Sequence, residues 1–211
     1  AAIGLQHAHA HGLVHRDVKP SNVMLTTTGE VKVLDLGLAR LTDDQAPTQE
    51  VTGAEQVMGT GDYIAPEQGQ DSHQADARSD VYSLGCTLYF LLSGRPPFCG
   101  PEHHTFFKKV TAHSQLPVPP IREKRDDAPD GLILVLERML AKQPRDRFQT
   151  GAEVAEALTP WTDGADLRRL AAQIIQARPT AGHEAHVDTP GVSQSARPTA
   201  RTPPPERSAA S

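Results

Sequence analysis

Residues 15–22 read His15-Arg16-Asp17-Val18-Lys19-Pro20-Ser21-Asn22, and Asp35-Leu36-Gly37 follows soon after them. Between these two stretches, short apolar runs at 23–25 and 31–34 bracket Thr28-Gly29-Glu30, a sequence typical of a hairpin turn. The pattern predicts two short strands with a polar loop on either side. The side chains of those two loops are therefore the first candidates for a functional site.

Helical patterns surround this hairpin. Residues 3–11 resemble the end of a helix, and Gly12 stands where helices often end on a left-handed residue. Residues 79–93 are apolar on all sides, which predicts a buried helix at the centre of the domain. Further helices are predicted from amphipathic patterns at 102–111, 131–141, 151–158 and 163–176.

The two polar loops carry Asp17, Lys19, Asn22 and Asp35, a set suited to a nucleotide and its metal ions. Phosphoryl transfer depends mostly on alignment and on the spreading of negative charge. We expect Asp17 to accept a hydrogen bond from an attacking hydroxyl and Lys19 to place a positive charge near the transferred group. Asn22 and Asp35 offer hard oxygen ligands, which suit Mg²⁺ and not zinc.

Residues 15–22 resemble the catalytic loop of the eukaryotic-type protein kinases at every signature position. Asp35-Leu36-Gly37 stands where that family usually has Asp-Phe-Gly, and Leu36 keeps an apolar side chain there. Over residues 1–160 the chain is similar to the C-terminal lobe of a Ser/Thr protein kinase of the bacterial receptor-like kind. The resemblance implies a mainly α fold, a helical bundle with a small β-hairpin at the catalytic cleft. Its further motifs are Ala65-Pro66-Glu67, Asp80-Val81-Tyr82-Ser83-Leu84-Gly85 and Pro144-Arg145-Asp146-Arg147.

The resemblance implies a catalytic set made of Asp17, Lys19, Asn22 and Thr60. Thr60 would hydrogen-bond toward Asp17 and Lys19 and so shape the pocket for the acceptor hydroxyl. Lys19 and the stretch 59–63 are of the Ser/Thr type and not of the tyrosine type. The expected function is therefore transfer of the ATP γ-phosphoryl group to Ser or Thr hydroxyls of protein substrates.

A nucleotide set is implied in the same way, made of Lys19, Asn22, Met24 and Asp35. Met24 would form the floor beneath the adenine ring, a role that suits a flexible apolar thioether. A plain core position is the alternative for Met24. The expected cofactors are ATP and Mg²⁺, or Mn²⁺ in its place, with Asn22 and Asp35 as the metal ligands.

In the family, the arginine at the position of Arg16 receives a phosphate from the activation loop. Residues 38–64 show little periodicity and are long enough for such a functional loop. A phosphothreonine can order a loop by pairing with arginine. Autophosphorylation at Thr48 or Thr52 is therefore a hypothesis, with Thr42 less favoured because it lies close to the metal loop.

The resemblance also implies two structural roles, a brace from Asp80 to the catalytic-loop backbone and an ion pair between Glu67 and Arg147. Asp80 also suits the start of a helix for electrostatic reasons. A metal cluster at the alternating histidines of 7–11 is disfavoured, because helical positions two apart point to opposite sides.

A non-catalytic kinase-like module that acts through protein contacts is the alternative function. A kinase also needs a glycine-rich loop, a strand lysine and a helix glutamate, none of which lies in these residues. We expect the chain to be a fragment without the N-terminal lobe. The sequence that precedes Ala1 in the gene distinguishes the two functions.

Composition bounds the remaining possibilities. A formal charge of −5 gives no basic field for nucleic acid, so no nucleic-acid partner is expected. Cys86 and Cys99 suggest reduced thiols, and no apolar run is long enough for a membrane segment. We expect a cytoplasmic location, with any membrane anchor of the parent lying beyond Ser211.

The C-terminal residues differ from the rest in composition. Residues 178–211 contain no Leu, Ile, Met or aromatic residue, and Pro, Ser, Thr, Ala and Arg dominate them. Such a segment buries too little apolar area to offset its ordering entropy. We expect a kinase lobe at 1–160, an extra helix within 161–177, and a disordered linker or tail at 178–211.

Overall fold

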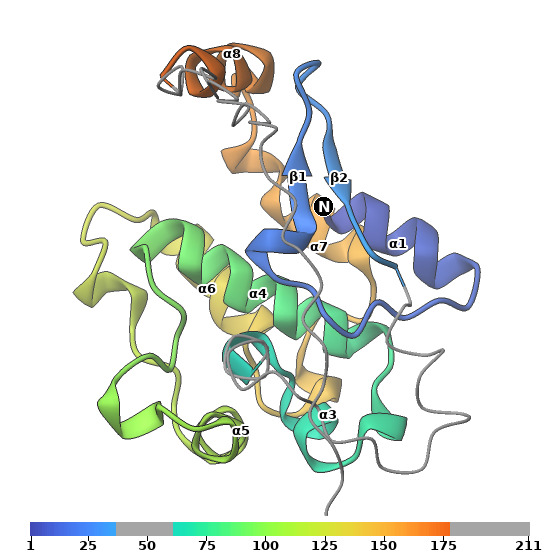
Figure 1. Cartoon of the computed structure of the whole chain (residues 1–211), viewed down its shortest axis with the longest axis vertical. Coiled ribbons are helices and arrows are strands. Elements are labelled where there is room, and N and C mark those ends of the chain that lie inside the picture. Colours follow the sequence, from blue (N-terminus) through green and yellow to red (C-terminus); the bar gives the residue numbers. More distant parts are fainter. Residues whose placement is uncertain (37–60, 178–211) are drawn as a thin grey trace, which may run out of the picture. The chain divides into compact units, whose positions relative to one another are not determined.

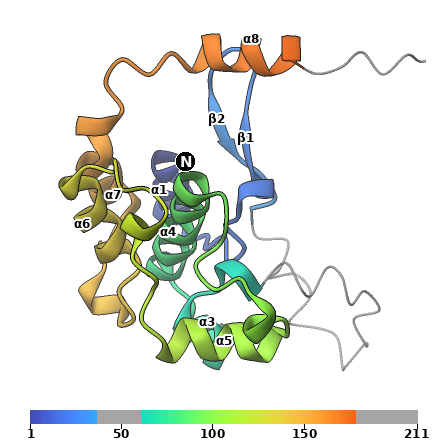
Figure 2. The ribbon, with the colours of Figure 1, turned by 90° about the vertical axis from the view of Figure 1, so that its left-hand side faces the viewer.

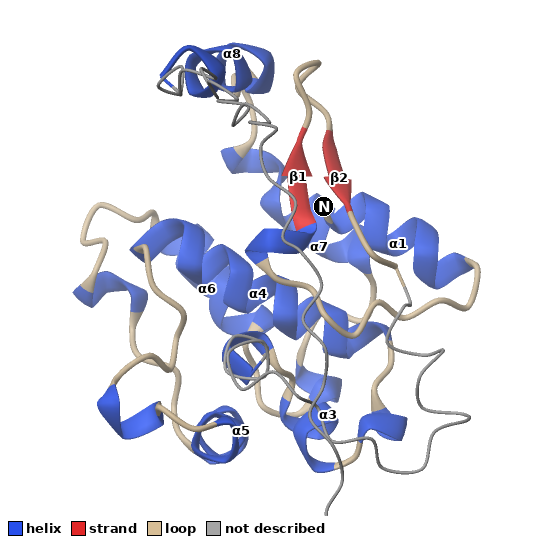
Figure 3. Ribbon diagram, viewed as in Figure 1, coloured by secondary structure: helices blue, strands red, loops and turns tan. Residues whose placement is uncertain are grey.

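The chain folds around a central helix, α4 (Ala77–Ser93), in a computed structural model that describes residues 1–36 and 61–177 (Figure 1). The described part is mainly helical and holds a single two-stranded antiparallel sheet (Figure 3). This confirms the expected kinase-like helical lobe with a small hairpin. The other elements are α1 (Ala2–Ala10), β1 (Val23–Leu25), β2 (Val31–Val33), α3 (Pro66–Gln70), α5 (Phe106–Gln115), α6 (Asp130–Met139), α7 (Gly151–Leu158) and α8 (Leu167–Ala177).

Both ends of α4 are set by local sequence. The Asp76 side chain accepts a hydrogen bond from the Arg78 amide at 2.8 Å, and the Asp76 amide donates to Ser79 Oγ at 3.3 Å. This reciprocal arrangement is a capping box, which satisfies amides that the first helical turn leaves unpaired. Gly94 ends the helix with a φ of 77°, in the left-handed region that glycine adopts without strain.

The apolar core consists of two clusters on either side of α4. Tyr82 and Cys86 pack with the α6 side chains, while Val81 and Leu84 pack with α1 and α7. A Cβ at Gly85 would lie 3.0 Å from the Met139 Cβ, so the glycine permits the close approach of α4 and α6. The buried hydrophobic residues contributed by the neighbouring helices include Leu5, Ile133, Leu136, Met139, Leu140 and Val154.

The prediction that α4 is buried on all sides is wrong at its C-terminal end. Leu91 keeps 66% of its surface exposed, whereas Tyr82 is fully buried. α4 contacts α1, α3, α6 and α7, and Leu92 in its last turn packs against the core, whereas its neighbour Leu91 stays exposed.

Helix boundaries differ from the predictions where a turn intervenes. α5 starts at Phe106 because Thr105 accepts a hydrogen bond from the Lys108 amide at 3.3 Å, and Pro101–His103 forms a 3₁₀ turn instead. α8 starts at Leu167, after Gly164 with a φ of 81°. The short helix α3 has too few residues to show a period, so the sequence pattern missed it. No helix in the described ranges is both long and apolar enough to cross a membrane.

The ion pair between Glu67 and Arg147 joins α3 to the segment before α7. Arg147 is 1% exposed, and its two terminal nitrogens donate to the two Glu67 carboxylate oxygens at 2.7 and 2.8 Å. Its guanidinium also donates to three backbone carbonyls, those of Ala141, Arg78 and Lys142. Burial raises the pKa of Glu67, but hydrogen bonds and charge from Arg147 more than offset this, and the pKa lies below its usual value.

We expect Glu67→Gln to lower the free energy of unfolding by about 3 to 5 kcal/mol, because it leaves a buried guanidinium without its counter-charge. Urea denaturation of the unaltered and altered chains measures this loss. Asp127→Asn, which breaks an exposed pair with Arg125, is the matched control and leaves the midpoint unchanged. Equal midpoints for all three proteins would show that the buried pair is not a stabilising contact.

His113 of α5 is a second buried polar group. It is fully covered, and its Nδ1 shares a hydrogen bond of 2.9 Å with the Tyr82 hydroxyl. Lys142 Nζ donates to the His113 carbonyl at 2.7 Å. Burial, and to a smaller extent the positive charge of Lys142, lowers the pKa of His113 to about 3. The histidine is therefore neutral in the folded protein at ordinary pH.

This histidine should make the protein less stable in mild acid. Below a pH of about 6.5 the unfolded chain binds a proton at this position and the folded chain does not, so stability falls as the pH decreases toward 3. The contribution of one such group is at most ~1.4 kcal/mol per pH unit. We expect His113→Gln, which keeps an acceptor for Tyr82, to reduce the slope of unfolding free energy between pH 6 and 4 in urea titrations. His73→Gln, at an exposed position, serves as the control; identical slopes for all three proteins would contradict the assignment.

Candidate active site

The loop that carries Asp17 is held by the buried carboxylate of Asp80, in the first turn of α4. Asp80 accepts hydrogen bonds from the backbone amides of His15 and Arg16, both at 2.8 Å. His9 of α1 donates from Nε2 to the same carboxylate at 2.7 Å. The expected brace from Asp80 to this loop is therefore present, and His9 faces Asp80 instead of joining a histidine metal cluster.

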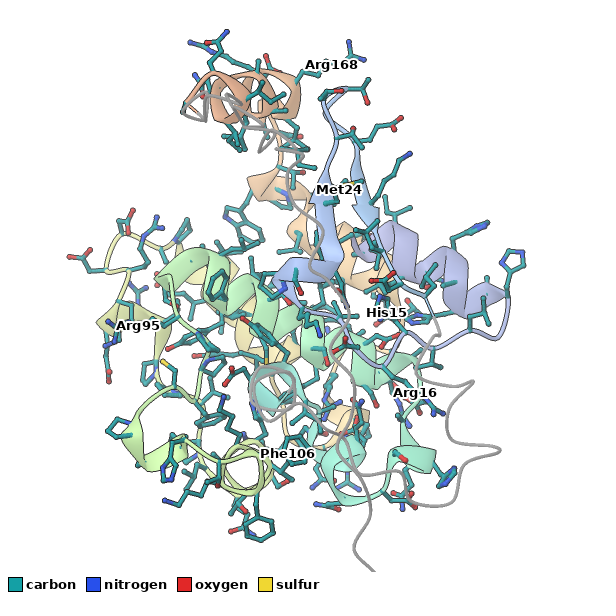
Figure 4. All side chains as sticks on the ribbon, in the orientation of Figure 1. His15, Arg16, Met24, Arg95, Phe106 and Arg168 are labelled. Atoms are coloured by element: carbon teal, nitrogen blue, oxygen red, sulfur yellow. The ribbon has the colours of Figure 1, made fainter. Side chains whose placement is uncertain are left out.

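Arg16 takes a left-handed backbone conformation, with a φ of 65°. Such a conformation is uncommon for a residue with a long side chain and requires support from its surroundings. The Asp80 carboxylate supplies that support on the amide side, and Gln68 of α3 donates to the Arg16 carbonyl at 2.6 Å. Figure 4 shows His15 and Arg16 on this loop, beneath the hairpin.

The catalytic-loop side chains Asp17, Lys19 and Asn22 lie in direct contact. Lys19 Nζ is 2.7 Å from Asp17 Oδ2, and the Asn22 side-chain amide donates to the same oxygen at 3.1 Å. The Asn22 amide also donates to the Asp17 carbonyl at 2.8 Å. The carboxylate of Asp17 is about one-third exposed, so it is both oriented and accessible.

The hairpin brings Asp35 alongside Asn22 in the backbone ladder. Val23 pairs with Val33, and the Leu34 amide continues the ladder by donating to the Asn22 carbonyl at 2.8 Å. His15 donates from Nε2 to the Leu34 carbonyl at 2.7 Å, which ties the end of β2 to the catalytic loop. Asp35 follows with a φ of 58°, a left-handed conformation that aspartate tolerates better than most residues.

The chemistry of these donors fits a magnesium ion. The Asn22 amide nitrogen is engaged by Asp17, so the side-chain oxygen, which also accepts a hydrogen bond from Ser21 Oγ at 3.5 Å, is the atom that could face a cation, and Asp35 adds a carboxylate. Among the described residues no group of three or more His, Cys, Asp or Glu side chains could hold a metal alone. Magnesium differs from zinc in this respect, since it is commonly bound by one or two protein oxygens together with phosphates and water.

Met24 lies on β1 between these loops, paired with Lys32, and keeps 42% of its surface exposed (Figure 4). The core alternative for this side chain is therefore wrong. Thr60, Thr48, Thr52 and Thr42 lie outside the described residues.

Two functional contacts were missed by sequence reasoning. Gln68 follows the Ala65-Pro66-Glu67 motif directly, but nothing in its type indicates a contact with Arg16 fifty-two residues away. In the sequence, His9 is only one of several alternating histidines. Its placement at the buried start of α4 depends on how α1 crosses α4, which the pattern of residues does not specify.

Comparison with known proteins agrees with this geometry. Residues 2–159 match the protein kinase domain family. A probable serine/threonine-protein kinase of Corynebacterium efficiens, CE0033, is 45% identical over 158 residues, which cover 73% of this chain and 23% of that protein. The serine/threonine-protein kinase PknB of Mycolicibacterium smegmatis is 44% identical over 154 residues, covering 73% and 24%.

A third relative aligns over more of the chain. The probable serine/threonine-protein kinase PknB of Corynebacterium glutamicum is 40% identical over 189 residues, which cover 88% of this chain and 26% of that protein. The chain thus spans about a quarter of the length of the curated relatives it matches. With its motifs, its helical lobe and its family match over residues 2–159, the chain belongs to the protein kinase domain family.

Proposed function

We propose that the protein to which this chain belongs is a Ser/Thr protein kinase, which transfers the γ-phosphoryl group of ATP to Ser or Thr hydroxyls of protein substrates. The contact of Asp17 with both Lys19 and Asn22 is the observation that carries the proposal. The names of the similar proteins, all serine/threonine kinases, support the same acceptor class.

Each loop residue has a chemical task in this proposal. An acceptor hydroxyl donates its hydrogen bond to the Asp17 carboxylate, which orients the oxygen lone pair toward the γ-phosphorus and receives the proton as the new O–P bond forms. The bond between the γ-phosphorus and the β,γ-bridging oxygen breaks, and ADP leaves. Lys19, 2.7 Å from Asp17, offsets negative charge on the phosphoryl oxygens near the acceptor.

The metal ligands of the proposal are Asn22 and Asp35. Asn22 is 8% exposed and held by Asp17, so its carbonyl oxygen is oriented before a cation arrives. A bound Mg²⁺, or Mn²⁺ in its place, would supply charge neutralisation of the phosphates. Because Leu34 pairs with Asn22, the backbone fixes where Asp35 leaves the strand.

The remaining nucleotide and substrate contacts follow the family resemblance. The exposed side chain of Met24 on β1 is available to an adenine ring. Thr60 is proposed to hydrogen-bond toward Asp17 and Lys19 and so to favour a Ser or Thr acceptor. The kinase lobe is proposed to cover residues 1–160, with α8 and the tail at 178–211 as additions to it, and to work in the cytoplasm without a nucleic-acid partner.

Arg16 supports a further part of the proposal, regulation by phosphorylation. Its Nε atom is buried without a hydrogen-bond partner among the described residues. A buried guanidinium nitrogen is costly without an acceptor, and a phosphate supplies three strong ones. Thr48 and Thr52 are the proposed phosphorylation sites.

Asp17→Asn should abolish most of the activity of the protein that contains this chain. Loss of a positioned proton acceptor costs roughly 10²- to 10⁴-fold in rate. The measurement is transfer of radiolabel from γ-labelled ATP to a generic acceptor protein. Asp163→Asn, at an exposed position, is the matched control and keeps full activity.

A further comparison separates loss of chemistry from loss of fold. Asp17→Asn keeps side-chain size and a carbonyl acceptor, so thermal unfolding should stay within the range of the control variant. Unchanged labelling by Asp17→Asn would contradict the kinase assignment and favour a module that acts through protein contacts.

Autophosphorylation is tested by mass spectrometry of the same protein after incubation with Mg-ATP. We expect phosphate on Thr48 or Thr52, absent from the Asp17→Asn protein, because a loop phosphate pairs with the guanidinium of Arg16. Arg16→Gln should leave the phosphate in place and remove the activation that follows it. Unmodified peptides throughout 42–60 would count against this hypothesis.

A further inference from the structure

Helix α8 lies beyond the residues that match the kinase family, yet it contacts the hairpin of the active site. The family match ends at residue 159, and α8 covers Leu167–Ala177. Both ribbon views place α8 across the turn between β1 and β2 (Figures 1 and 2). Arg168 reaches the turn and donates from Nε to the Thr28 carbonyl at 2.9 Å (Figure 4).

The turn is shaped to receive this helix. Gly29 has a φ of 82°, and a Cβ built on it would lie 2.7 Å from Arg168 Cγ, 2.9 Å from its backbone nitrogen and 3.3 Å from its Cα. Since two of these three atoms are backbone, a side-chain rotation would not relieve the clash. Ala171, one turn further along α8, is only 5% exposed. The approach of α8 therefore depends on the absence of a side chain at Gly29.

The hairpin that α8 contacts connects the two proposed metal ligands. Asn22 directly precedes β1, and Asp35 follows β2 after Leu34. Each strand has three residues, and exposed side chains on them include Met24 at 42% and Val31 at 39%. An isolated two-stranded hairpin is marginally stable in water, so its geometry depends on what packs against it. A contact at the turn is therefore expected to affect the distance between Asn22 and Asp35, which lie at the opposite end of the hairpin.

We propose that α8 is a strap that holds the β1–β2 turn and thereby positions Asn22 and Asp35 for Mg-ATP. This inference rests on the proposed kinase function. Arg168 and Gly29 are positioning residues in it, since neither one touches the reacting groups. The apolar face of α8 stays partly open, with Leu170 at 45% and Ile174 at 56% exposure, so the docking depends on few contacts and can be broken by single substitutions.

Two substitutions release the strap in different ways. Gly29→Asn keeps a residue that tolerates the left-handed turn but adds the Cβ that α8 cannot accommodate. Arg168→Ala removes the donor to Thr28 and leaves the turn intact. The matched controls are Gly94→Asn, at a left-handed glycine with open space around its Cβ position, and Arg169→Ala, at the exposed neighbour of Arg168.

Hydrogen exchange on the 211-residue chain tests the docking. The backbone amides of α8 should exchange at least about tenfold faster in Gly29→Asn and Arg168→Ala than in the unaltered chain, because each loses a contact that holds the helix. The two controls should exchange as the unaltered chain does. Equal α8 exchange in all five proteins would overturn the proposal.

Kinetics of the whole kinase that contains this chain test the positioning. We expect the KM for Mg-ATP to rise several-fold in the two strap variants, while the KM for an acceptor peptide stays constant. Faster exchange with an unchanged KM for Mg-ATP would show that α8 docks without positioning the site, and would overturn the proposal. If the unaltered protein labels no acceptor at all, the proposed kinase function itself fails, and the exchange result reports on α8 separately.

Discussion

One buried carboxylate, that of Asp80, determines the shape of the catalytic loop. It accepts hydrogen bonds from the backbone amides of His15 and Arg16 and from the ring nitrogen of His9. These three donors compensate the carboxylate, which is fully buried. A buried charge without such partners costs several kcal/mol. The same bonds hold Arg16 in its left-handed conformation, and the direction in which Asp17 leaves the loop follows from it.

The first turn of α4 connects this brace with the rest of the lobe. Ser79, adjacent to Asp80, donates to Glu67 at 2.7 Å, and Arg147 links Glu67 to the Arg78 carbonyl. The catalytic loop, α3 and the segment before α7 therefore converge on three consecutive residues of one capped helix. Because these bonds are buried or partly buried, displacement of any one of these parts leaves a polar group without its partner, which favours a single arrangement of the site.

Much of this could be predicted from the sequence, because the decisive signals are local. The hairpin follows from two apolar runs around a glycine turn, and the contacts of Asp17 with Lys19 and Asn22 follow from their places in one short loop. Contacts between segments that are distant in the sequence were harder to predict. The hydrogen bonds of Gln68 to Arg16 and of Arg168 to Thr28 depend on how the helices cross, which the spacing of residues does not show. Leu91 is predicted to be buried because an apolar run does not show which side of the last helical turn the neighbouring segments cover.

The two ends of the Asn22 side chain differ: its nitrogen donates to Asp17, and in the proposed site its oxygen would face a cation. Aspartate is nearly the same size and is the better magnesium ligand, but it has no N–H to donate and would set a second negative charge against Asp17. Glutamine has both groups, yet its extra methylene would misplace them. The hydrogen bond to Asp17 therefore restricts the side chain at this position more tightly than magnesium affinity does, and asparagine meets the first requirement while remaining the weaker metal ligand.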